Sequence, residues 1–209
     1  MRRKPRRPAQ LTDEQIEAIE GGSDVAYNSE LAHASAQALI PMGRNYIEYD
    51  LEVRGRILKL AEVEGIDVLA ETWVSSPETT LPGILWRGYL LREWIRRDSA
   101  IVAKRFTASC EAIRDHGKEG EQKIAQTPEP SVVAEQWDAV FSGHFDGYFD
   151  EVLRDSARLT DVLATLSTTW IDSDDDELAT RVTRRDKAME LNSREFRHAG
   201  DLALHGGLE

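Results

Sequence analysis

The sequence predicts an all-α fold, a multi-helix bundle around a central apolar helix at about 81–97 and a long heptad-patterned helix at about 145–171. The first observation behind this prediction is a 4-3-4-3-4-3-4 spacing in the second of these segments. It places seven apolar residues and one serine on a single helical stripe: Phe145, Phe149, Val152, Ser156, Leu159, Leu163, Leu166 and Trp170. At about 1.5 Å of rise per residue the stripe would be roughly 38 Å long, so we expect this helix to set the length of the fold.

The second observation is the segment 80–98 (TLPGILWRGYLLREWIRRD), which is apolar around most of the circumference of a helix. A helix of this kind is buried on more than one side, so we expect it in the middle of the bundle, beside the 145–171 helix. Gly88 would permit the close approach of a neighbouring helix. A third observation agrees, because no stretch shows the alternation of apolar and polar residues that predicts a strand.

One residue of the central segment, Arg92, conflicts with burial because it lies inside the apolar arc. A guanidinium cannot lose its charge, so Arg92 must pair with a carboxylate or bind an anion. Glu71 or the acid-rich residues 134–177 could supply the carboxylate. Arg87 and Arg96 would complete the anion site in the second case.

The elements before the central helix follow in chain order. Residues 1–10 are charged and contain two prolines, which predicts a disordered basic tail. A capping-box pattern at Thr12 and Gln15 predicts a short first helix that ends at Gly21-Gly22. Apolar spacing and terminating Pro or Gly residues then predict three more helices, at about 29–40, 47–64 and 66–74.

The elements after the central helix begin with a helical continuation over 98–116. Residues 117–130 are polar and rich in Gly and Pro, so we expect a mobile loop there. Thr127 or Ser131 would cap the next helix, near 132–142.

The chain then continues through an acidic break at 172–176 to a last polar helix that ends at about His198. We expect residues 11–199 to form a single helical domain. Residues 200–209 would be a frayed tail, in which Leu208-Glu209 is typical of a vector-derived end.

Composition limits the cellular setting. The chain has 209 residues, of which 41% are apolar and 31% are charged, as in a soluble globular domain. No apolar run is long enough to span a membrane, and no apolar segment follows the basic start as in a signal peptide. The lone Cys110 cannot form an internal disulfide, which favours the cytoplasm. Its thiol is either a buried structural group or a nucleophile.

The net charge of −12 is unevenly distributed. Residues 134–177 hold twelve acids and two arginines, a net charge of −10, whereas residues 81–105 hold six bases and two acids, a net charge of +4. The basic tail contributes Arg2, Arg3, Lys4, Arg6 and Arg7. This tail either solubilises the protein or acts as a nucleic-acid arm together with the basic segment 87–105.

Two Glu-x-x-His pairs are weak candidates for metal ligands, Glu30 with His33 and Glu195 with His198. A di-metal carboxylate bundle uses two such pairs and two further glutamates, but no inward-facing glutamates are evident here. The solvated face of a helix is the alternative interpretation. The common signatures of acyl transfer, zinc hydrolysis and nucleotide-phosphate binding are absent, so we expect no cofactor and no enzymatic activity.

Three blocks of sequence resemble one known family: PAQLTDEQ (8–15), AHASA (32–36) and above all SPETTLPGILWRGYLLREWIRRD (76–98). They are similar to a family of uncharacterised actinobacterial proteins of about this length. Members sometimes carry the label of an RNA polymerase beta subunit or a thymidine phosphorylase, but this chain is far too short for either enzyme. The resemblance therefore implies a helical fold and no known activity.

These observations favour a non-enzymatic helical interaction or scaffold protein that binds a protein partner or associates with itself. The candidate residues for anion or partner binding are Arg87, Arg92, Arg96, Trp86 and Trp94, although both tryptophans could instead belong to the core. A transcription-associated or nucleic-acid-binding factor and a metal-carboxylate bundle are the alternatives.

Overall fold

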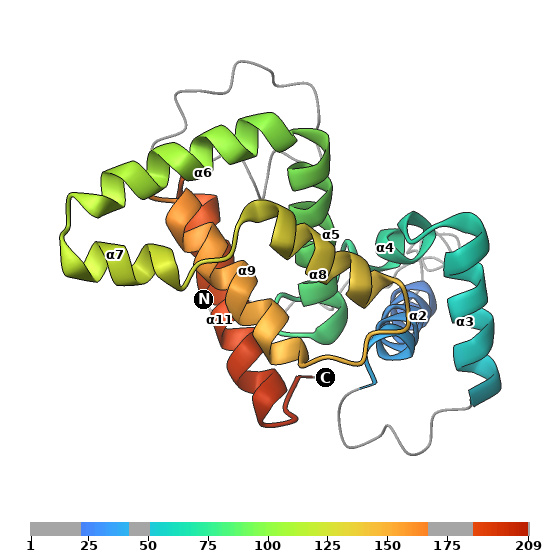
Figure 1. The fold of residues 1–209 in the computed structure, drawn as a ribbon. Coiled ribbons are helices and arrows are strands. Elements are labelled where there is room, and N and C mark those ends of the chain that lie inside the picture. Colours follow the sequence, from blue (N-terminus) through green and yellow to red (C-terminus); the bar gives the residue numbers. More distant parts are fainter. Residues whose placement is uncertain (1–21, 42–50, 167–185, 209) are drawn as a thin grey trace, which may run out of the picture.

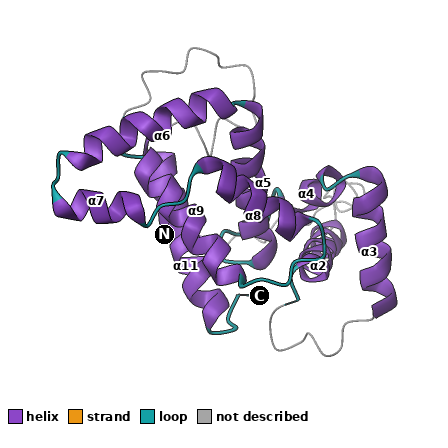
Figure 2. Ribbon diagram, viewed as in Figure 1, coloured by secondary structure: helices purple, strands orange, loops and turns teal. Residues whose placement is uncertain are grey.

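All regular elements in the described part of the chain are α-helices (Figures 1 and 2), which confirms the predicted all-α class. The computed structural model describes residues 22–41, 51–166 and 186–208. The basic tail, the expected first helix and the acidic break at 172–176 lie outside these ranges. The helices are α2 (Gly22–Leu39), α3 (Leu51–Glu64), α4 (Asp67–Trp73), α5 (Leu81–Arg97), α6 (Ser99–Arg114), α7 (Lys118–Ala125), α8 (Pro130–Phe141), α9 (Phe149–Leu163) and α11 (Asp186–Leu204).

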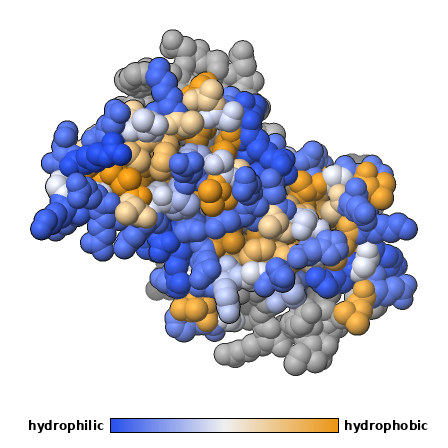
Figure 3. All heavy atoms as spheres, viewed as in Figure 1, coloured by the Kyte–Doolittle hydropathy of each residue, from blue (hydrophilic) through white to orange (hydrophobic). Residues whose placement is uncertain are grey.

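Polar side chains cover most of the face shown in Figure 3, as the charged composition predicts. None of the described helices has both the length and the apolar character of a membrane-crossing segment.

Helix α5 begins where the sequence predicts and occupies the centre of the bundle. Thr80 caps it by accepting a hydrogen bond from the Gly83 backbone N–H at 3.3 Å, and Pro82 in the first turn needs no hydrogen-bond partner. Ten of its residues are buried, and it packs mainly against α8 and also against α2 and α4. The predicted burial on several sides therefore holds.

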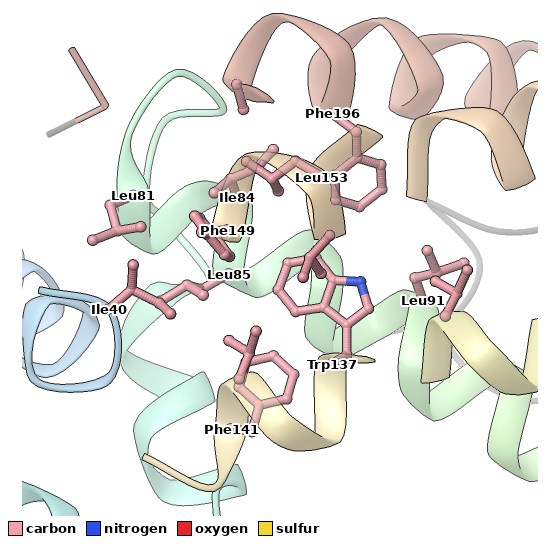
Figure 4. Packing of buried hydrophobic residues seen from close by; sticks show 14 of the residues in the cluster. Ile40, Leu81, Ile84, Leu85, Leu91, Trp137, Phe141, Phe149, Leu153 and Phe196 are labelled. Carbon is pink, nitrogen blue, oxygen red and sulfur yellow. The ribbon is translucent and has the colours of Figure 1, made fainter. Parts of the chain in front are cut away.

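The contact between α5 and α8 depends on a glycine. A Cβ atom at Gly88 would lie closer than 3.0 Å to the indole ring of Trp137 on α8. Trp137 is fully buried, and its Nε1 donates a hydrogen bond to the Ser156 hydroxyl of α9 at 2.8 Å. Figure 4 shows this ring among the core side chains, and its centroid lies 6.0 Å from that of Phe149 and 6.1 Å from that of Phe196.

Helix α9 is shorter than the stripe at 145–171 predicts, because it begins at Phe149 and ends at Leu163. At about 1.5 Å per residue it is roughly 22 Å long. Phe145 lies half-buried in the preceding loop, and Trp170 lies outside the described residues.

The expected pairing of α9 with α5 is also wrong, because α9 packs mainly against α11. The Ser193 hydroxyl of α11 donates to the Ala157 carbonyl of α9 at 2.9 Å. Trp137 of α8 fills the space beside Gly88 instead. The two apolar helices thus share one core, but each has another helix as its main neighbour.

The expected loop at 117–130 contains helix α7. Gly117 turns the chain with a positive φ of 69°, and Ile124 packs against a small cluster that includes Cys110, Ile113 and Val162. Acidic residues in its first turn and Lys123 in its last turn suit the helix dipole.

Three helix ends also differ from the sequence prediction. Helix α2 begins at Gly22, well before the expected start at 29. Helix α8 begins at Pro130, and neither Thr127 nor Ser131 caps it. At the C-terminal end, α11 continues to Leu204 and Leu208 is fully buried, so the expectation of a frayed tail fails for these residues.

Candidate functional site

The arginines of α5 were the first candidates for a binding site, but in the structure they pair with acidic residues of the same chain. Arg92 donates to the carboxylates of Asp138 on α8 and of Glu93 on α5 itself, and its guanidinium carbon lies 5.7 Å from the ring centroid of Phe141. Arg96 donates to the other oxygen of Asp138 at 2.8 Å. Asp138 lies within the acid-rich segment, so the geometry favours the ion-pair interpretation over the anion site.

Arg87 joins α5 to α11. Its Nε donates to the carboxylate of Glu195, and its Nη1 donates to the carbonyl oxygen of Gly83 at 3.0 Å. The side chains of Arg87 and Glu195 are only 17% and 12% exposed. A guanidinium already paired with a carboxylate in this way favours an internal ion pair over a site for an external anion.

The rest of the basic segment 87–105 also contacts the protein itself. Arg97 pairs with Asp98 at 3.4 Å. Arg105 donates to the carbonyl oxygens of Leu163 at 2.9 Å and Leu166 at 3.0 Å, where a cation suits the C-terminal end of α9. These contacts remove support for this segment as a nucleic-acid surface. The basic tail, Arg2 to Arg7, lies outside the described residues.

The two tryptophans of α5 have different surroundings. Trp94 is 3% exposed and belongs to the core. Trp86 is half-buried and stacks on Tyr89, with ring centroids 5.6 Å apart. The Tyr89 hydroxyl donates to Asp67 at 2.8 Å, and burial together with this hydrogen bond raises the pKa of Tyr89 above its ordinary value. Neither tryptophan is therefore a fully exposed anchor.

The metal candidates do not converge. In the described ranges, no three His, Cys, Asp or Glu side chains lie together as a possible metal site. Glu195 is engaged by Arg87, and His198 is exposed. The Nδ1 atom of His33 lies 2.8 Å from the carbonyl oxygen of Ser29, within its own helix.

Cys110 is buried in the small cluster between α6, α7 and α9. Burial raises the pKa of its thiol, which disfavours the nucleophilic thiolate. Its surroundings favour the structural interpretation.

A surface that the sequence analysis did not single out lies on α3 and α4. Helix α3 runs along one edge of the molecule (Figure 1) and contains no buried residue. It is attached by half-buried side chains such as Ile57 and Leu58 and by Arg54, whose Nε donates to the carbonyl oxygen of Ala38 on α2 at 2.9 Å.

Several apolar side chains of α3 and α4 point away from the core. We call this surface the α3–α4 edge, and it consists of Leu60 (41% exposed), Val63 (68%), Val68 (40%) and Val74 (47%), which directly follows α4. Figure 3 shows apolar side chains over these two helices, at the right of the view. Leu60 and Val63 are three residues apart and therefore adjacent on the helix surface.

The charges around the α3–α4 edge are mainly acidic and include the exposed base Lys59, next to Leu60. Residues 60–86 contain five acids and no lysine, arginine or histidine. Four of these acids lie on α3, on α4 or between them, and all four are exposed: Glu62, Glu64, Asp67 and Glu71. The sequence feature that could have indicated this surface is the absence of bases over residues 60–86. Periodicity alone did not show which apolar residues face outward.

The comparisons with known proteins give no further guidance. The chain matches no protein-family model, no curated protein and no solved structure.

Proposed function

We propose that this chain is a non-enzymatic helical interaction protein and that it binds a protein partner at the α3–α4 edge. The observation that carries the proposal is the outer helix α3, which buries no residue and yet presents Leu60 and Val63 to solvent. Scattered single apolar residues are normal on a protein surface, whereas apolar residues gathered on adjacent turns mark interaction sites. The arginines and Trp94 of α5 are engaged internally, which directs the proposal to the α3–α4 edge.

The energetic reason is the hydrophobic effect. Covering exposed apolar surface releases about 25 cal/mol per Å², and side chains three or four residues apart are the usual anchors when helices pack together. Val63 is two-thirds exposed, so its contact with a partner would bury surface that folding leaves in water. The exposed acids around it would form the polar rim of such an interface.

Site-specific photo-crosslinking in the source cell tests the proposal. A photoreactive amino acid replaces Val63 in one variant and Ile101 of α6, which is 51% exposed, in the matched control. We expect a discrete crosslinked product at position 63 that disappears when Leu60→Asp is added, and no such product at position 101. Equal products at both positions, or none at either, would count against the α3–α4 edge as a binding surface.

A further inference from the structure

We infer that the partner presents a basic amphipathic helix to the α3–α4 edge, with an apolar stripe flanked by lysine or arginine. This inference rests on the proposed function and adds the chemistry of the partner. The apolar anchors require a complementary apolar stripe, and the surrounding charge determines the sign of its flanks.

The charge argument starts from what the described acids already contact. Elsewhere in the protein acids meet bases, as in the pairs of Asp138 with Arg92 and of Lys123 with Asp161 at 2.8 Å. Within the part of the chain that the structure describes, no ion pair involves Glu62, Glu64 or Glu71. Their carboxylates are exposed and remain available to cations of a partner.

The same charges disfavour a second copy of this chain as the occupant. In a two-fold symmetric dimer each edge would meet its own equivalent, so two surfaces with a net negative charge would face one another. Like charges facing each other across an interface cost energy, and the net charge of −12 adds a long-range repulsion between copies. A basic partner is instead attracted both by the acids at the interface and by the net negative charge of the whole chain.

The α4 side of the surface is also held in place before any partner arrives. Helix α4 is anchored by Leu69, Ala70 and Trp73, which are all buried, and Trp73 donates from its Nε1 to the Ser35 hydroxyl of α2 at 2.9 Å. Gly65 has a positive φ of 95° and ends α3 with a hydrogen bond to Ala61. A fixed surface loses little conformational entropy on binding.

Synthetic amphipathic peptides test the inference. Three labelled helical peptides about five turns long share one leucine stripe and carry lysine, glutamine or glutamate on their flanks. Fluorescence anisotropy with the full chain measures their affinities at low and at physiological salt. We expect the lysine peptide to bind about tenfold more tightly than the glutamine peptide and to weaken as salt rises, and the glutamate peptide not to bind.

Two double variants test whether the peptide binds at the α3–α4 edge. Leu60→Gln with Val63→Gln should weaken the lysine peptide about tenfold, whereas Ile101→Gln with Val132→Gln, two exposed residues of α6 and α8, should leave its affinity unchanged.

Two triple variants, each with three glutamates replaced by glutamine, have the same net charge as one another and test the role of the acids. Replacing Glu62, Glu64 and Glu71 by glutamine should weaken the lysine peptide about tenfold, as the combined loss of three exposed charge interactions. The matched control removes three exposed acids from α6 and α7, at the opposite end of the molecule in Figure 1: Glu111→Gln, Glu119→Gln and Glu121→Gln.

Equal weakening by both triple variants would mean that only net charge acts, and it would overturn the inference. If the glutamine peptide binds as tightly as the lysine peptide and still requires Leu60 and Val63, the basic partner is wrong while the proposed binding surface stands. A dimer in sedimentation equilibrium that Leu60→Glu dissociates would assign the edge to a second copy and overturn the inference. If neither the apolar variants nor the charge variants change the affinity for the lysine peptide, the inference is overturned as well.

Discussion

Replacing Gly88 by alanine should destabilise the protein, because the added Cβ would lie closer than 3.0 Å to the Trp137 ring. Carbon atoms in contact prefer about 3.5–4.0 Å, so the ring or the helix must move. The ring has little freedom, since Trp137 is fully buried, donates to Ser156 and packs against Phe141 at a centroid distance of 5.4 Å. Overpacking of this kind costs about 1–3 kcal/mol.

The substitution also has a favourable part. Alanine is a better helix former than glycine by about 1 kcal/mol. Taking the upper end of the overpacking range because the ring is held on several sides, the expected net loss is about 2 kcal/mol, or roughly 4–8 °C in Tm for a chain of this size.

Gly55→Ala is the matched control, because Gly55 lies inside α3 with no atom within 4 Å of the added Cβ. It should gain about 0.5–1 kcal/mol from helix propensity alone. Urea unfolding followed by far-ultraviolet circular dichroism measures both variants. If Gly88→Ala is as stable as the parent, or gains as much as Gly55→Ala, the close packing of α5 on α8 is refuted.

Three further predictions follow from contacts of buried side chains, two for substitutions and one for a thiol reaction. Ser156→Ala leaves the buried Nε1 of Trp137 without its acceptor, and it should lower the free energy of unfolding by about 1–3 kcal/mol in the same urea assay. Arg87→Met leaves the Glu195 carboxylate, 12% exposed, without its guanidinium; after allowance for partial exposure, the loss should be about 2 kcal/mol. Cys110 should react with a thiol-specific disulfide reagent at pH about 8 only as fast as the protein opens, because burial shields the thiol and raises its pKa, and urea should release it.

Each of these expectations has its own control or contrary outcome. Arg194→Met breaks an exposed pair with Glu190, whose side chains are 70% and 53% exposed, and should cost less than about 0.5 kcal/mol. Equal losses for this variant and Arg87→Met would show that burial of the Arg87 pair does not matter. Unchanged stability of Ser156→Ala would remove the hydrogen bond from the account, and rapid modification of native Cys110 would contradict its buried position.

The sequence contained enough information to predict where the central helix lies. Its apolar circumference predicted burial on several sides, and a glycine within it predicted a close approach of another helix. The position of Arg92 inside the apolar arc required a carboxylate partner, and Asp138 lies in the acid-rich segment that the sequence indicated. These inferences were possible because each depends on residue types within one segment of the sequence and not on which helices pack together.

Pairing of helices was harder to predict, because periodicity shows that a face is buried but not what covers it. The stripe on α9 faces α11, and the choice depends on side-chain shape, such as Trp137 beside Gly88. Helix α7 was missed because its composition is polar and Ile124 supplies its contact with the small cluster. The α3–α4 edge was missed for a related reason, since α3 has apolar residues on both its inner and outer sides.

Hydrogen exchange by mass spectrometry, with and without the lysine peptide, tests the central claim most directly. If the α3–α4 edge is the binding surface and the charges of α5 are internal, exchange should slow over residues 51–74 and stay unchanged over 81–97 and 118–125. Slower exchange over 81–97, with none over 51–74, would contradict the account and return the binding site to the arginines and tryptophans of α5.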